Sequence, residues 1–64
     1  MIIYQNEHFA VTQSEINKHV MIVQKIDNTR VKMLYHASMD ESAPMMSKEE
    51  SKELLHEFIE FHKG

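Results

Sequence analysis

The 64-residue chain has no cysteine and no tryptophan, and it has only one proline and one glycine. Without cysteine it has no disulfide and no thiolate metal site. The one glycine is the last residue, which excludes a glycine-rich phosphate-binding loop. Turns must therefore be built from Asn, Asp, Ser and Thr, and such residues cluster at 5–7, 14–18 and 27–29.

Long apolar segments and an excess of basic residues are also missing. The longest unbroken apolar run, residues 20–23, is far short of the roughly 20 residues that a membrane-spanning helix needs. The first residues lack the basic start and apolar core of a signal peptide. Seven Lys and Arg stand against ten Asp and Glu, a net charge of −3, which disfavours nucleic acid as a partner. We expect a cytoplasmic protein without membrane association.

The segments between the turn clusters are rich in β-branched and aromatic residues, which is typical of strands. A helical alternative exists for residues 13–24, because residues 12–15 fit a capping box and Ile16, Val20 and Val23 follow at helical spacing. The density of β-branched residues after His19 favours the strand. We therefore predict antiparallel strands at residues 2–5, 8–13, 19–26 and 30–38.

The last two predicted strands form a hairpin around residues 27–30. A two-residue turn at Asn28 and Thr29 gathers apolar residues on one face, but it needs a positive φ at Thr29 and places Lys25 opposite Lys32. A three-residue loop with the register shifted by one residue is the alternative. In the favoured register the facing pairs are Ile26 with Val31, Gln24 with Met33, Ile22 with Tyr35, and Val20 with Ala37.

The C-terminal segment predicts an amphipathic helix over about residues 48–63. Ser47 fits the N-cap, and Glu50 three residues later completes a capping box. Gly64 suits the position that terminates the helix. An apolar stripe follows the helical repeat through Leu54, Leu55, Phe58, Ile59 and Phe61.

These elements predict one α+β domain over residues 1–64. A small antiparallel β-sheet of three to four strands, within about residues 2–38, precedes the helix. The connection at residues 39–46 is long enough to let the helix fold back and pack on one face of the sheet.

The five histidines are the main chemical resource of the chain. His56 and Glu60 share one helix face with Glu53, but such a trio would hold a divalent ion only weakly, and a solvated acidic face is the better interpretation. His19 and His36 approach each other across the hairpin, where they fit rim positions better than ligand positions. We therefore predict no metal ligands and no cofactor.

Catalysis is poorly supported by the sequence. No serine stands in the strained turn that exposes a nucleophile, and a chain of 64 residues has few walls for a water-excluding pocket. We do not expect an enzyme, and a metal-dependent or composite-site enzyme is the least favoured class.

The main functional inference comes from the sheet face that one helix leaves open. The strand at 19–26 is apolar on both sides, and contiguous exposed apolar area usually marks an interaction site. A two-fold homodimer is the commonest way to cover such a face. We hypothesise a small self-associating interaction or regulatory protein that also binds another protein. Its predicted interface consists of Met21, Val23, Leu34, Met45 and Met46.

The alternative is a nucleic-acid-associated module. It requires Lys18, Lys25, Arg30 and Lys32 to gather on one edge of the folded sheet, although the net charge of the chain is negative. The position of these four residues in the fold separates the two hypotheses.

Overall fold

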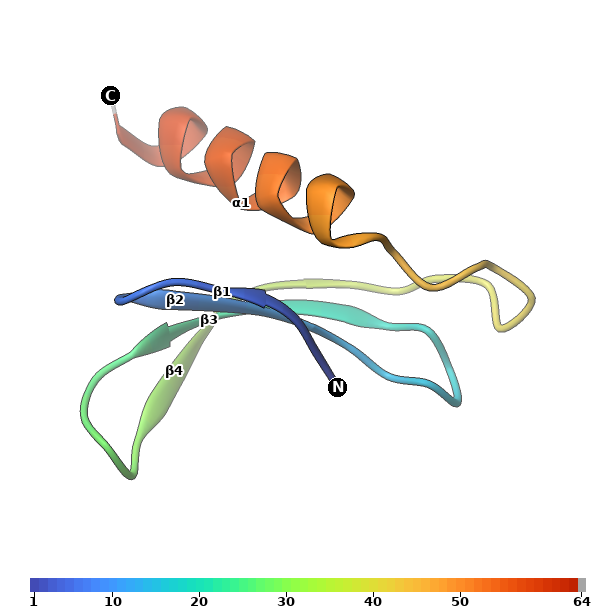
Figure 1. Cartoon of the computed structure of the whole chain (residues 1–64), viewed down its shortest axis with the longest axis horizontal. Helices are drawn as coiled ribbons and strands as arrows, with labels where there is room; N and C mark the ends of the chain where they lie inside the picture. Colours follow the sequence, from blue (N-terminus) through green and yellow to red (C-terminus); the bar gives the residue numbers. More distant parts are fainter. Residues whose placement is uncertain (64) are drawn as a thin grey trace.

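The computed structural model describes residues 1–63 and confirms the α+β architecture (Figure 1). Strands β1 (Ile2–Gln5), β2 (Phe9–Gln13), β3 (Val20–Lys25) and β4 (Val31–Ala37) form one antiparallel sheet in the order β1-β2-β3-β4. Helix α1 (Lys48–Lys63) packs on one face of this sheet. Each strand lies within its predicted range, and the helical alternative for residues 13–24 is wrong, because β2 extends to Gln13, a turn follows it and β3 begins at Val20.

Helix α1 begins as its sequence predicts. The Glu50 backbone N–H donates to Ser47 Oγ at 3.1 Å, and the Ser47 N–H donates to Glu50 Oε1 at 3.2 Å. This reciprocal pair is a capping box, which satisfies donors that the first turn of a helix leaves without partners. The predicted terminating residue, Gly64, lies outside the described residues.

The hydrophobic core lies between α1 and the middle of the sheet. Val11 of β2 pairs directly with Ile22 of β3, and both are fully buried together with Val20 and Leu55. Burying each of these side chains contributes roughly 1.5–3 kcal/mol. Half-buried side chains that surround this cluster include Tyr4, Phe9, Met46, Leu54, Phe58 and Ile59.

The register of the β3–β4 hairpin differs from the favoured prediction at its loop end. The pairs Ile22–Tyr35 and Val20–Ala37 are as predicted. Closer to the loop the register is shifted by one residue, so the predicted pairs Ile26–Val31 and Gln24–Met33 are wrong. The observed pairs there are Val23–Met33, Gln24–Lys32 and Lys25–Val31, and an irregularity between Ile22 and Val23 joins the two registers.

The loop explains this shift. Residues 27–29 form the three-residue alternative, closed by the Ile26 N–H donating to the Arg30 carbonyl at 3.1 Å. Asp27 Oδ1 accepts the N–H groups of Thr29 and Arg30, each at 2.8 Å. This arrangement avoids a positive φ at Thr29, and it removes the opposition of Lys25 and Lys32.

The shifted register also changes which face of the sheet holds two apolar side chains. Directly paired residues of antiparallel strands point to the same face, and a shift of one residue reverses that face. Val31 and Met33 pair with Lys25 and Val23, so they lie on the face opposite α1. Tyr35, in the unshifted part, lies on the helix side, with its ring 5.7 Å from the ring of Phe58.

One polar residue, Gln13 at the end of β2, connects two loops to the sheet. Its side chain is only 1% exposed. Its Nε2 donates to the Lys18 carbonyl at 3.1 Å, and its Oε1 accepts the Met46 N–H at 2.7 Å. Gln13 therefore holds both the β2–β3 turn, where Lys18 has a φ of 63°, and the segment that leads into α1.

Candidate interaction surface

The face of the sheet opposite α1, which we name the open face, is built from rows of paired residues. The first row crosses all four strands through Ile2, Thr12, Met21 and His36. The second crosses them through Gln5, Ala10, Val23 and Met33, and the third pairs Lys25 with Val31.

A continuous apolar patch occupies the β3–β4 half of the open face. Val31 is 60% exposed, Met33 is 57% exposed and Met21 is 37% exposed, whereas Val23 and Leu34 are half-buried. Leu34 lies between Met33 of the open face and Tyr35 of the helix side, and it has no partner in β3 because the register shifts at this point. We name these five residues the apolar patch.

The structure divides the interface that the sequence predicts. Met21, Val23 and Leu34 come together in the apolar patch. Met46 instead packs against the hydrophobic core on the helix side, and Met45 beside it is half-buried. Val31 and Met33 are the members of the patch that the sequence analysis missed, because the favoured register placed them on the helix side.

The open face is hollowed by the bend of the sheet. In Figure 1 the β3–β4 hairpin curls away from α1, and the turn between β2 and β3 bends in the same direction. Ala10, in the middle of the sheet on this face, is only 4% exposed although no helix covers it. The sheet therefore bends toward the side of its open face, with the curled hairpin at one end.

Lys25 carries the one full charge in the three rows of the open face. Its Nζ donates to Gln5 Oε1 at 2.7 Å and to the Asn6 carbonyl at 2.9 Å. The ammonium group is thus held at the margin of the sheet, and its half-buried aliphatic stem adds apolar surface to the open face.

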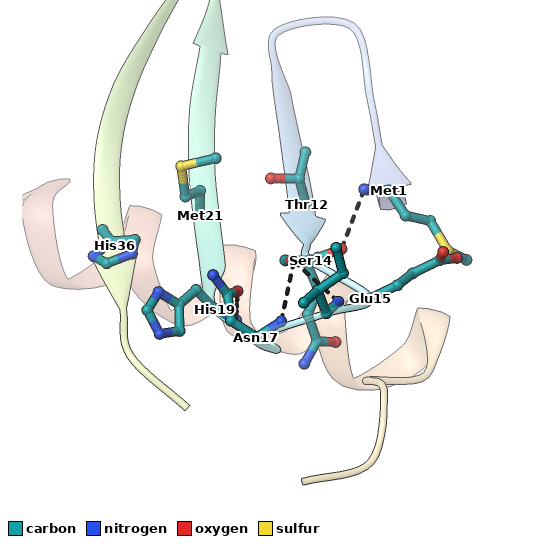
Figure 2. Close-up of a pocket in the computed structure, with 10 residues that line it drawn as sticks. Met1, Thr12, Ser14, Glu15, Asn17, His19, Met21 and His36 are labelled. Carbon is teal, nitrogen blue, oxygen red and sulfur yellow. Dashed lines mark hydrogen bonds between the residues drawn. The ribbon is translucent and has the colours of Figure 1, made fainter. Parts of the chain in front are cut away.

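A pocket of about 570 Å³ lies at the end of the open face, beside the β2–β3 turn (Figure 2). The first row supplies Thr12, Met21 and His36 to its lining, and the turn supplies Ser14 and His19, among others. The rings of His19 and His36 meet edge to face, with centroids 5.2 Å apart and planes at 71°. The sequence predicts that these two residues approach each other and that they occupy rim positions.

The four basic residues of the alternative hypothesis do not gather on one edge. Lys18 lies in the β2–β3 turn, at the opposite end of the sheet from Arg30 in the β3–β4 loop. Lys25 faces the open face, whereas Lys32 pairs with Gln24 and faces the helix side. Three of the four donate to groups of this chain: Lys18 Nζ to the Glu15 carbonyl, Lys25 Nζ as described above, and Arg30 Nε to Asp27 Oδ2.

Acidic and histidine side chains show no reactive arrangement in the described part of the chain. Within residues 1–63, no three or more His, Cys, Asp or Glu side chains are placed to hold a metal ion, and this includes the trio around His56.

The pKa of Asp27 is lowered by the Thr29 backbone N–H and then by the Arg30 side chain. The pKa of Asp40 is lowered by the backbone N–H and then the hydroxyl of Ser42. Both carboxylates cap exposed turns.

No helix within residues 1–63 has the length and apolar character required to cross a membrane. No protein-family model matches the sequence, and no curated protein and no solved structure is significantly similar to it.

Proposed function

We propose that the chain is a small cytoplasmic interaction protein that forms a two-fold dimer through its open face and binds another protein in that form. The observation that carries this proposal is the apolar patch. The shifted hairpin register adds Val31 and Met33 to the patch residues that the sequence predicts, and none of the strands or the helix within residues 1–63 covers them. Contiguous exposed apolar patches on soluble proteins are typical of interaction sites.

The surface area of the chain supports a second copy as the occupant. Its accessible surface is 4841 Å², whereas a monomeric protein of 7.6 kDa exposes about 4,300 Å². The surplus, on the order of 500 Å², approaches the roughly 800 Å² that each partner hides in a standard interface. Only five apolar side chains are buried among the described residues, and such a contact would add to this burial.

The charge and the shape of the open face also favour a second open face, in preference to a charged partner, as its occupant. The ammonium group of Lys25 is held at the margin of the sheet by Gln5 Oε1 and the Asn6 carbonyl, so the charge lies beside the apolar patch and not within it. The curled hairpin carries Val31 and Met33 at one end of the open face, where we expect the second copy to contact them (Figure 1). The proposal assigns no surface to the further protein partner.

Sedimentation equilibrium tests the dimer directly. We expect a mass twice the 7.6 kDa of the chain at micromolar concentration. Met33→Glu should restore the single-chain mass, because the dimer would force a carboxylate against apolar area. Met33 is 57% exposed, so this variant should keep its fold, which circular dichroism verifies. The matched control is Phe61→Glu on α1, 83% exposed and away from the open face, which should remain dimeric.

Two results would contradict the proposal. One is a mass of 7.6 kDa for the unmodified protein over the whole accessible concentration range. The other is a dimer that Phe61→Glu dissociates and Met33→Glu does not, which would place the contact on the helix side.

A further inference from the structure

The pocket at the end of the open face brings together three side chains of types that can bind a metal ion, one from β3, one from β4 and one from the residue that precedes β3. Met21 and His36 are direct cross-strand partners. His19 precedes Met21 by two residues along the chain, so the two side chains emerge on the same face of the sheet. The 5.2 Å between the ring centroids of His19 and His36 completes a cluster of two imidazoles and one thioether (Figure 2).

The backbone beneath this cluster is fixed. The His19 N–H donates to Asn17 Oδ1 at 3.0 Å, and the His19 carbonyl accepts the Ser14 N–H at 3.0 Å. His36 belongs to β4, whose pairing with Met21 sets its position. The side chains themselves retain freedom, because His36 and Met21 are exposed and His19 is half-buried. Exposed side chains change rotamer within picoseconds to nanoseconds, so the His36 imidazole and the Met21 thioether can turn toward His19 without backbone movement.

The donor set selects the kind of ion. Imidazole nitrogen binds zinc, nickel and copper, whereas a thioether is a soft ligand that favours Cu(I). A structural zinc site would need four ligands, usually including thiolates, and calcium or magnesium would need several oxygen ligands. The pocket also contains Glu15, but Figure 2 shows it across the pocket from the two rings.

We propose that His19, Met21 and His36 bind one copper ion in its Cu(I) state. Each imidazole donates one nitrogen and Met21 donates its sulfur. The site uses residues of one chain and goes beyond the proposed self-association, with which it shares Met21 of the apolar patch.

Competition for Cu(I) tests the site. The full chain is titrated under anaerobic, reducing conditions against a chromophoric Cu(I) chelator, and we expect binding of one ion per chain. His19→Ala and His36→Ala should each weaken binding by about tenfold or more, the scale of loss seen when even indirect partners of a metal site are removed. His8→Ala is the matched control, since His8 is an exposed histidine outside the pocket, and it should leave the affinity unchanged.

Met21→Leu isolates the thioether, because it keeps the volume and apolar character of the side chain. We expect it to weaken Cu(I) binding and to leave Ni(II) binding by the two imidazoles unchanged, as followed by the histidine ring signals in NMR spectra. The proposal is overturned if Cu(I) does not bind with a stoichiometry of one, if His8→Ala weakens binding as much as His36→Ala, or if Met21→Leu has no effect on Cu(I).

Discussion

Gln13 shows how one buried polar side chain can connect parts of the fold that are distant in sequence. Its amide group donates to the β2–β3 turn at Lys18 and accepts from Met46, 33 residues further along the chain. A buried glutamine is uncommon because its amide needs partners in the interior, and here both ends of the amide have one. The sequence pattern gives no sign of this role, since an isolated Gln at the end of a strand is usually exposed.

Replacing Gln13 should therefore destabilise the domain strongly. Gln13→Leu keeps an apolar side chain of similar size but leaves the Met46 N–H and the Lys18 carbonyl without their partner. Each unsatisfied buried group costs about 1–3 kcal/mol, so we expect the free energy of unfolding in urea to fall by about 2 kcal/mol or more. Gln24→Leu, at an exposed position of β3, should change it by less than about 0.5 kcal/mol. Equal effects of the two substitutions would show that the Gln13 amide is not structural.

The pair of histidines is a second residue-scale feature that the sequence only partly indicates. The favoured register pairs His36 with Met21, as the structure does at this end of the hairpin, so the proximity of His19 and His36 was predictable from that register. The edge-to-face contact of their rings and the pocket beside them depend on the shape of the β2–β3 turn. That shape arises from Ser14, whose Oγ accepts the N–H groups of Ile16 and Asn17.

At the scale of elements, the local signals were sufficient. The capping box of Ser47 and Glu50 and the apolar stripe after it define α1. Both can be recognised in the sequence because each depends on residues that lie within two helical turns of one another. Turn clusters and β-branched residues define the four strands for the same reason. Local signals could not predict the register of β3 with β4, because that register depends both on the conformation of the loop and on the packing of both faces of the sheet.

At the loop end of the hairpin the loop determines the register, and at the other end the hydrophobic core determines it. Asp27 fixes a three-residue loop, which shifts the adjacent pairs by one residue. The irregularity between Ile22 and Val23 then restores the register that buries Ile22 and Val20. Bulges of this kind bend the strand that carries them, which agrees with the curl of the hairpin in Figure 1.

The contribution of Asp27 to stability should depend on pH. Its hydrogen bonds favour the ionised form, so its pKa in the folded state lies below the usual 3.8. A group with a lowered folded-state pKa adds stability above its unfolded-state pKa and loses it as the pH falls through the folded-state value. We expect Asp27→Asn to lower the urea midpoint by a constant amount above about pH 5. The wild-type and variant midpoints should then converge as the pH falls below 3.8.

Urea titrations of both proteins between neutral and strongly acidic pH provide the measurement. Asp40→Asn offers a parallel case, because the pKa of Asp40 is lowered in the same direction by Ser42. A difference between wild type and Asp27→Asn that is as large in strong acid as at neutral pH would show that the loop does not depend on the charge of Asp27.

For the molecule as a whole, the sequence predicts that one helix cannot cover both faces of the sheet, and the structure shows which face remains open. The sequence alone could not predict how apolar that face is. The register shift that Asp27 sets turns Val31 and Met33 away from α1, so the choice of loop determines the composition of a surface. The core is correspondingly small, and the domain relies on few fully buried side chains.

A small core and a large apolar patch together imply that the stability of this domain depends on its concentration. If the open face is covered by a second copy, folding and association are linked, and dilution favours the unfolded chain. Each tenfold rise in concentration should add about 1.4 kcal/mol to the free energy of unfolding of the dimer.

We expect the thermal midpoint to rise by several degrees from low to high micromolar concentration. Met33→Glu should melt at one temperature throughout, and that temperature should match the dilute limit of the wild type. Calorimetry or circular dichroism over this range makes the comparison, and a wild-type midpoint that does not move would mean that the chain folds alone and leaves its apolar patch exposed.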